Sequence, residues 1–223
     1  MDWTAIALTA RLSGCTALVL LVAGLPVAWW LATTRWRGRI FVEAVVALPL
    51  VLPPTVLGYY VLVALGPHGA LGAWYERLAG SRLPFTFGGL LVASSLYSLP
   101  FAVQPFTAAF RTVDPQLVEA SRNLGASPWQ TFWRVVVPLA WPGLLAGMVL
   151  SFAHTLGEFG VVLMVGGNVP GATRTVSISI YDAVQSLDYA AASRTSLLLL
   201  IVSFVILVST YSLQRTVWIK PRH

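Results

Sequence analysis

The sequence predicts an all-α polytopic membrane protein that crosses the bilayer about five times and forms a single domain over residues 1–223. Three observations favour this class. Hydrophobic residues make up 57% of the chain and charged residues 10%, apolar runs of about 20 residues recur along it, and lysine and arginine concentrate in alternate connections. The apolar excess argues against a disordered chain or a nucleic-acid-binding module, and one cysteine, Cys15, builds no disulfide framework.

Apolar runs long enough to cross about 30 Å of hydrocarbon as helices occur in five places. The fourth run is the longest and is interrupted by His154 and Glu158. Folded as a hairpin it would leave about 16 residues per arm, roughly 24 Å, so we interpret it as one span with a broken outer end. The predicted spans are residues 12–33, 40–65, 90–110, 135–167 and 196–213.

The orientation of these spans follows from the positive-inside rule, because cytoplasmic connections keep an excess of lysine and arginine. The connections that we place inside carry Arg35, Arg37, Arg39, Arg111, Arg122, Arg134, Arg215, Lys220 and Arg222. The opposite side holds Arg77, Arg82, Arg174 and Arg194. The N-terminus is therefore predicted outside and the C-terminus in the cytoplasm. Arg11 and Glu43 are interpreted as interfacial anchors or, for Glu43, as the partner of Arg39 in a helix-end ion pair.

The connection at about residues 111–134 is polar yet patterned as a short helix over residues 115–124. Asp114 is a candidate N-cap, Pro115 suits the first helical position, and Gly125 suits the left-handed conformation that ends a helix. The residues between them form a narrow apolar stripe suited to a partner's groove or a membrane surface. This stripe consists of Leu117, Ala120, Ser121 and Leu124.

This connection resembles the EAA loop of ABC importer permeases, which have the MetI-like fold. The sequence Glu119-Ala120-Ser121 is followed by Gly125 and then by residues 135–138, Val-Val-Val-Pro, at the spacing of the family pattern. Serine replaces the second alanine, and valines replace an isoleucine and a leucine. The resemblance implies a cytoplasmic coupling helix that docks in a cleft of an ATP-binding subunit. The coupling residues it implies are Glu119, Ala120, Ser121, Leu124, Gly125 and Pro138.

A narrower resemblance, to the permeases of molybdate importers, covers nearly the whole chain. It rests on residues 48–54 (Leu-Pro-Leu-Val-Leu-Pro-Pro), 157–160 (Gly-Glu-Phe-Gly) and 168–175 (Asn-Val-Pro-Gly-Ala-Thr-Arg-Thr). Sulfate permeases share the second element and a segment like residues 187–193, so sulfate, tungstate and thiosulfate stay open as substrates. The resemblance implies a homodimer in the bacterial cytoplasmic membrane, with two cytoplasmic ATP-binding subunits and an extracytoplasmic molybdate-binding protein.

The chain lacks the glycine-rich phosphate loop of an ATPase, so we expect ATP and Mg to be bound by the partner subunit and no cofactor by this chain. One cysteine, three scattered histidines and no paired carboxylates predict no catalytic residue and no metal site. The size of the pathway also favours a dimer, because five helices cannot easily surround an aqueous route and ten can. The rival class is a membrane scaffold without a transport route, in which the EAA-like segment is a chance amphipathic loop.

A route for a tetrahedral dianion should offer hydroxyl, amide and backbone N–H groups and keep carboxylates away. The candidate pathway or gate residues are Thr55, Gly58, Ser98, Gln104, Ser151, Thr155, Gly157 and Glu158. Purely structural roles are the alternative for these residues. The prolines at residues 49–54 would then produce a kink that shapes helix packing, and the hydroxyls would form hydrogen bonds within the bundle. Repulsion excludes Glu158 as an oxyanion ligand, so we expect it to accept N–H groups freed at a helix break or to pair across the dimer. We expect His154 to be packed and hydrogen-bonded.

Overall fold

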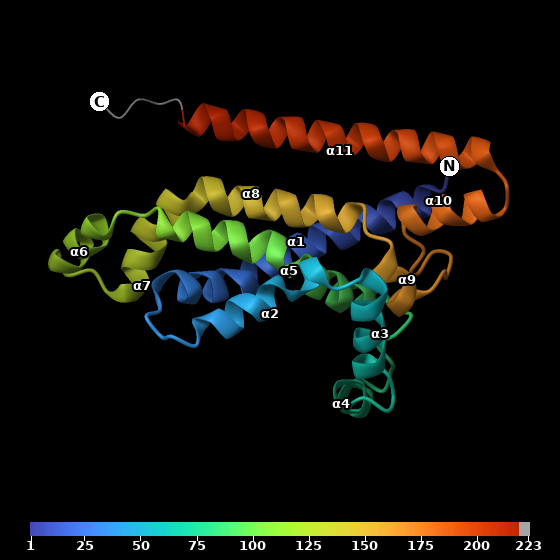
Figure 1. Ribbon diagram of the computed structural model, residues 1–223, viewed down its shortest axis with the longest axis horizontal. Coiled ribbons are helices and arrows are strands. Elements are labelled where there is room, and N and C mark those ends of the chain that lie inside the picture. Colours follow the sequence, from blue (N-terminus) through green and yellow to red (C-terminus); the bar gives the residue numbers. More distant parts are fainter. Residues whose placement is uncertain (219–223) are drawn as a thin grey trace.

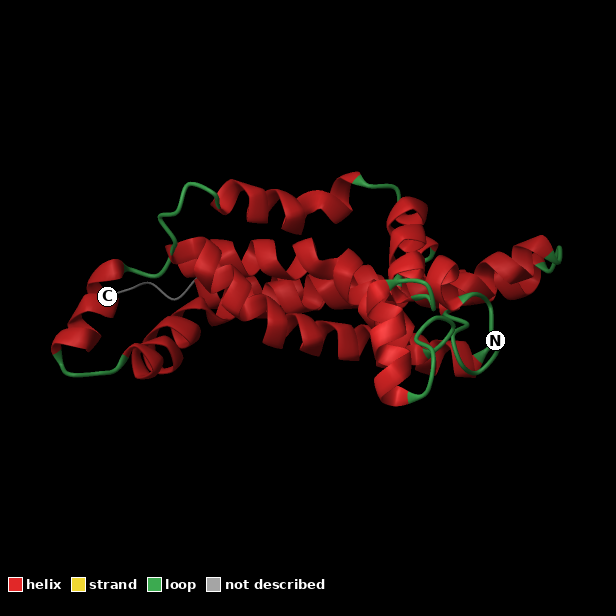
Figure 2. Cartoon of the chain, turned by 90° about the horizontal axis from the view of Figure 1, so that it is seen from below, coloured by secondary structure: helices red, strands yellow, loops and turns green. Residues whose placement is uncertain are grey.

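The computed structural model describes residues 1–218, and it places side chains up to residue 210 and at Ser212. Within this range the chain forms helices only, as predicted (Figures 1 and 2). They are α1 (Trp3–Thr33), α2 (Arg39–Val51), α3 (Pro54–Leu65), α4 (Ala70–Ala79), α5 (Phe87–Arg111), α6 (Pro115–Asn123), α7 (Pro128–Thr131), the π-helical turn η1 (Phe132–Val136), α8 (Val137–Leu156), α9 (Gly160–Gly166), α10 (Val176–Gln185) and α11 (Tyr189–Trp218).

Four helical stretches are long and apolar enough to cross a membrane: α1, α5, the continuous run of α7, η1 and α8, and α11. A fifth span is obtained if the bent pair of α2 and α3 counts as one. The long helices run nearly parallel in Figure 1, with α6 at one end of the bundle and α10 at the other. The prediction of about five spans is therefore confirmed by length and composition. Arg215, Lys220, Arg222 and the C-terminal His223 bear on the predicted orientation, but their side chains lie outside the described part of the chain.

The core lies where α1, α5 and α8 pack against one another. Phe106 is fully buried at its centre, and Gly147 on α8 lies so close that an added Cβ would meet the Phe106 ring at 2.6 Å. Small residues of this kind let membrane helices approach closely. By contrast, the described part of α11 packs mainly against α10 and α8, and most of its apolar stretch is exposed in the single chain.

The second predicted span, residues 40–65, is not one continuous helix. It breaks at Leu52 and Pro53, and the axes of α2 and α3 differ by 114°. Adjacent prolines explain the break, because neither Pro53 nor Pro54 has an N–H to donate and each ring pushes the preceding residue out of the helical region. Accordingly, Leu52 and Pro53 are extended, with ψ of 137° at both. In Figure 1, α3 projects sideways from the bundle and carries α4 with it.

The fourth predicted span is confirmed in its main feature, a broken end. Helix α8 ends at Leu156 and α9 starts at Gly160. Its other end begins earlier than expected, because α7 already starts at Pro128 and continues through η1. Pro138 accounts for the π-helical turn, since a proline inside a helix cannot bond to the carbonyl four residues back and its ring would clash there.

At the α10 end, short loops are tied to the helices by threonine hydroxyls. Thr173 Oγ1 donates to the Gly166 carbonyl at 2.6 Å, and the Val176 N–H donates to Thr9 Oγ1 at 2.9 Å.

Asp2 caps α1, and hydrogen bonds from the Thr4 hydroxyl and from the Ala5 and Thr4 N–H groups hold the pKa of Asp2 below its usual value. The last helix begins at residue 189 rather than at the predicted 196.

Candidate functional site

The EAA-like segment folds as the sequence predicts. The Gln116 N–H donates to Asp114 Oδ1 at 2.8 Å, and Pro115 occupies the first turn of α6. Gly125 has φ +86°, which favours glycine, and its N–H donates to the Arg122 carbonyl at 2.9 Å. The predicted start and stop of the helix are therefore confirmed, with Leu124 as the C-cap.

One face of α6 is exposed and apolar, and it differs from the predicted stripe by one residue. Leu117 is 46% exposed and Leu124 is 88% exposed, and Ala120 lies between them on the same face. The prediction that Ser121 belongs to this stripe is wrong, because its Oγ lies 3.1 Å from Thr131 Oγ1 at the start of the fourth span. Val118, one turn earlier, packs against the core. Helix α6 thus rests on the bundle through Val118 and Ser121 and presents the other face outward.

The remaining coupling candidates, Glu119 and Pro138, lie on different helices. Glu119 is exposed on α6 beside Ala120. Pro138 is exposed on α8, past the π-helical turn, and so belongs to the span and not to α6. The structure therefore brings Glu119, Ala120, Leu124 and Gly125 together at one end of the molecule and places Ser121 and Pro138 in supporting positions.

Three of the predicted pathway residues, Ser98, Ser151 and Thr155, gather with His154 in a buried polar layer between α5 and α8. Ser98 Oγ lies 2.9 Å from both Thr155 Oγ1 and His154 Nδ1, and Thr155 Oγ1 donates to the Ser151 carbonyl at 2.9 Å. Because Thr155 gives its one hydroxyl proton to Ser151, Ser98 donates to Thr155 and the His154 Nδ1–H donates to Ser98. The His154 ring also stacks on Phe101, with centroids 3.9 Å apart. His154 is thus packed and hydrogen-bonded, as expected.

Glu158 lies in the break between α8 and α9 and is 5% exposed. Its Oε1 accepts the Val161 N–H at 3.0 Å, which confirms the prediction that it binds a backbone N–H freed at the break. The hydroxyl of Ser94 lies close to the carboxyl group, and Ser94 is itself fully buried. The carboxyl group is therefore built into the break.

The other pathway candidates do not join this layer. Thr55 lies next to the α2–α3 break and is exposed, and Gln104 and Gly157 are also exposed. Gly58 is buried where α3 crosses α9, and an added Cβ there would lie 2.7 Å from Met164 Cβ. In a single chain Ser98, Ser151 and Thr155 are therefore internal, whereas Thr55, Gln104 and Gly157 are exposed.

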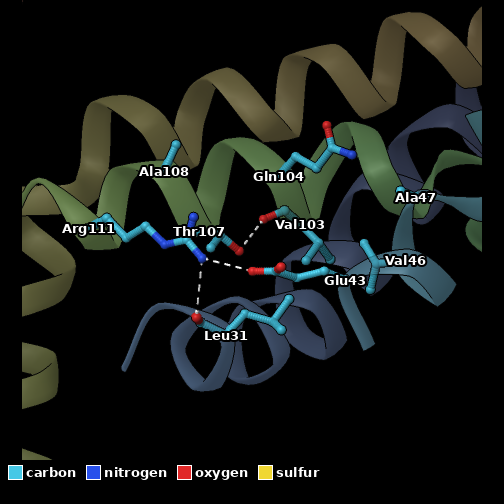
Figure 3. Close-up of a pocket in the computed structure, with 9 residues that line it drawn as sticks. All are labelled: Leu31, Glu43, Val46, Ala47, Val103, Gln104, Thr107, Ala108 and Arg111. Atoms are coloured by element: carbon cyan, nitrogen blue, oxygen red, sulfur yellow. Dashed lines mark hydrogen bonds and ion pairs between the residues drawn. The ribbon is translucent and has the colours of Figure 1, made fainter. Parts of the chain in front are cut away.

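The sequence reading missed an ion pair between α2 and α5. Arg111 Nη2 donates to Glu43 Oε1 at 2.9 Å and approaches the Leu31 carbonyl at 3.5 Å (Figure 3). The pairing of Glu43 with Arg39 is not formed, because Arg39 Nη1 instead reaches the Thr34 carbonyl at 3.5 Å. Beside the ion pair lies a pocket of about 320 Å³, lined by Leu31, Glu43, Val46, Ala47, Val103, Gln104, Thr107, Ala108 and Arg111. The partners are 68 residues apart in sequence, so no local signal identifies them.

Comparisons with known proteins agree on one family. Residues 24–220 match the family of binding-protein-dependent transport system inner membrane components. The chain is 52% identical over 214 residues to the molybdenum transport system permease protein ModB of Azotobacter vinelandii, covering 96% of this chain and 95% of that protein. It is 36% identical over 193 residues to the sulfate transport system permease protein CysT of Escherichia coli K12, covering 86% and 69%.

Solved structures resemble the fold at low sequence identity. The inward-facing MetNI methionine ABC transporter matches with a TM-score of 0.73 at 20% identity, over 97% of this chain and 96% of that chain. A bacterial ABC transporter that imports the acidic polysaccharide alginate matches with a TM-score of 0.76 at 21% identity, over 98% and 79%. The fold is therefore that of ABC importer permeases.

Proposed function

Because the chain belongs to the family of binding-protein-dependent transport system inner membrane components, we propose that it is the membrane-spanning subunit of an ATP-driven molybdate importer. Two copies form the route, two cytoplasmic subunits bind ATP and Mg, and an extracytoplasmic protein delivers the oxyanion. The N-terminus and the α10 end face outward, and the α6 end and the C-terminus face the cytoplasm of a bacterial cell.

The observation that carries a transport route is the exposed break between α2 and α3. Helix α2 has 13 residues, so the break lies about 20 Å from Arg39 along the helix and well inside a hydrocarbon layer about 30 Å thick. Val51 at the break is 82% exposed. Since Pro53 and Pro54 have no N–H, the carbonyls of Pro49 and Leu50 lose the donors that a continuous helix would supply.

Backbone carbonyls that lack hydrogen-bond donors do not face lipid. Non-helical backbone at membrane depth is tolerated only where protein buries it or where it lines a water-filled cavity. The face that carries the break therefore meets either a second copy or water. Two copies related by a twofold axis satisfy both conditions at once, with the breaks and the exposed Thr55 residues around a common aqueous route.

The substrate follows from the relatives rather than from the geometry. The relative with 52% identity over nearly the full length is named for molybdenum transport, and the more distant relative is named for sulfate. Both ions are tetrahedral dianions, which hydroxyl and N–H groups escort without discriminating strongly. We therefore assign molybdate and treat sulfate as the competitor that an experiment must exclude.

Uptake into proteoliposomes that hold the complete complex tests the proposal. With ATP on the side of the ATP-binding subunits and the binding protein on the other, labelled molybdate should accumulate in preference to labelled sulfate. Preferential sulfate uptake would assign the other ion. A complex that assembles with ATP-binding subunits yet accumulates neither oxyanion would favour the scaffold interpretation.

A further inference from the structure

Arg111 joins three parts of the molecule that the transport cycle has to coordinate. It is the last residue of α5, and α6 begins shortly after it, at Pro115. Its guanidinium reaches Glu43 on α2 at 2.9 Å and approaches the Leu31 carbonyl near the end of α1 at 3.5 Å (Figure 3). One side chain at the entry to the proposed coupling helix therefore contacts the broken second span.

The stretch from Arg111 to α6 is short and internally bonded. The Thr112 hydroxyl donates to the Ala109 carbonyl at 2.8 Å, and the Val113 N–H donates to the Phe110 carbonyl at 3.3 Å. Val113 packs against the core, and Asp114 caps the next helix. The connection from Arg111 to α6 therefore has little slack.

Helix α2, in contrast, is held loosely. Among its residues only Val46 and Pro49 are buried, and the pocket of about 320 Å³ lies between it and α5. Over the described residues, the Arg111–Glu43 pair is the one side-chain hydrogen bond or ion pair that joins α2 to α5. The pocket leaves space beside the pair, and the pair joins α2 to α5 at this point.

From this geometry we propose that the Arg111–Glu43 ion pair is the link through which movement of α6 positions α2, and with it the exposed break at Leu52 and Pro53. This inference rests on the proposed transport function. Both side chains are partly exposed, at 47% and 38%, and ion pairs of that kind are individually weak. A weak pair suits a link that is broken and remade in every cycle, because it does not hold one state against the other.

Charge reversal tests the link in the complete complex. Glu43→Arg and Arg111→Glu should each lower oxyanion uptake per ATP hydrolysed by about fivefold, the equivalent of about 1 kcal/mol. The double exchange restores the opposite charges with their positions swapped and should recover more than half of the wild-type ratio. A merely structural contact would change thermal stability and assembly but not this ratio.

A matched control lies at the other end of the molecule. Arg82 and Glu76 form a pair at 3.1 Å with similarly exposed side chains, and the same reversals there should leave uptake per ATP unchanged. If the reversal variants fail to assemble, Glu43→Gln, which removes the charge at nearly constant size, takes their place. Wild-type uptake per ATP in the assembled single variants, or no recovery in an assembled double exchange, would overturn the link. Failure of the proposed function is distinct, because then the wild-type complex itself accumulates no molybdate.

Discussion

Replacing Gly125 by valine isolates the geometry of the α6 end from its contacts. Gly125 has φ +86°, and nothing lies within 4 Å of the Cβ that a substitution would add. The cost of Gly125→Val is therefore backbone strain alone. A residue with a Cβ pays about 1–2 kcal/mol in the left-handed region, and a β-branched residue is at the upper end of this range.

In the Gly125→Val variant, we expect this backbone strain to be relieved within α6. Helix α6 has no fully buried residue and is attached through Val118 and Ser121. Reorienting its last turn is thus easier than disturbing the bundle. A cost of about 1–2 kcal/mol corresponds to a factor of roughly 5–30 in the population of the native α6 geometry. If α6 couples the ATPase to transport, uptake per ATP hydrolysed should fall by about the same factor.

Uptake and ATP hydrolysis measured on one purified preparation provide the assay, with insertion and dimer formation checked beside them. Gly80→Val is the matched control, because Gly80 also ends a helix, has φ +65° and has open space around its added Cβ. The control should retain the wild-type ratio. Wild-type import by Gly125→Val, or an equal loss in Gly80→Val, would refute the reasoning, and loss of membrane insertion would show that Gly125 serves folding.

Three further outcomes are expected. Cysteines introduced at Ala73 and Ala172 should be labelled from outside the cell, and one introduced at Ser127 from the cytoplasm. Labelling at Ser127 from outside would contradict the predicted topology. Gly58→Ala should lower the melting temperature of the complex, at an overpacking cost of about 1–3 kcal/mol, because the new Cβ meets Met164 at 2.7 Å; Gly14→Ala, with nothing within 4 Å, should not. Glu158→Gln keeps an acceptor for the Val161 N–H and should leave the ratio of molybdate to sulfate uptake unchanged, whereas Glu158→Ala should lose about 1–3 kcal/mol of stability in thermal unfolding.

Features set by local chemistry could be predicted from the sequence. Asp114, Pro115 and Gly125 each act on the backbone within one or two residues, so the bounds of α6 follow from them directly. The acceptor role of Glu158 is local in the same sense, since it bonds to an N–H three residues away. The number of spans follows from composition, because hydrocarbon thickness fixes the length of an apolar helix.

Features that depend on packing between distant segments could not be predicted. The spacing of α6 allows Ser121 to lie on either edge of the apolar stripe, and the position of Thr131 across the turn decides that it faces inward. Glu43 has an arginine one turn earlier, yet it pairs with Arg111, because the antiparallel packing of α2 on α5 brings that guanidinium to 2.9 Å. The prolines at 53 and 54 indicate a kink, but the angle of 114° depends on where α3 finds its contacts with α9.

The two helix breaks also differ in which backbone groups they free, and this difference bears on the route. Between α8 and α9 the break frees N–H groups, and Glu158 accepts one of them inside the chain. Between α2 and α3 the two prolines remove donors, so the freed groups are the carbonyls of Pro49, which is buried, and of Leu50, which is exposed. Carbonyl oxygens attract water, which donates to them, and repel a dianion, which has no hydrogen to give. An oxyanion on the proposed route is therefore expected to keep its hydration shell where it passes the first break.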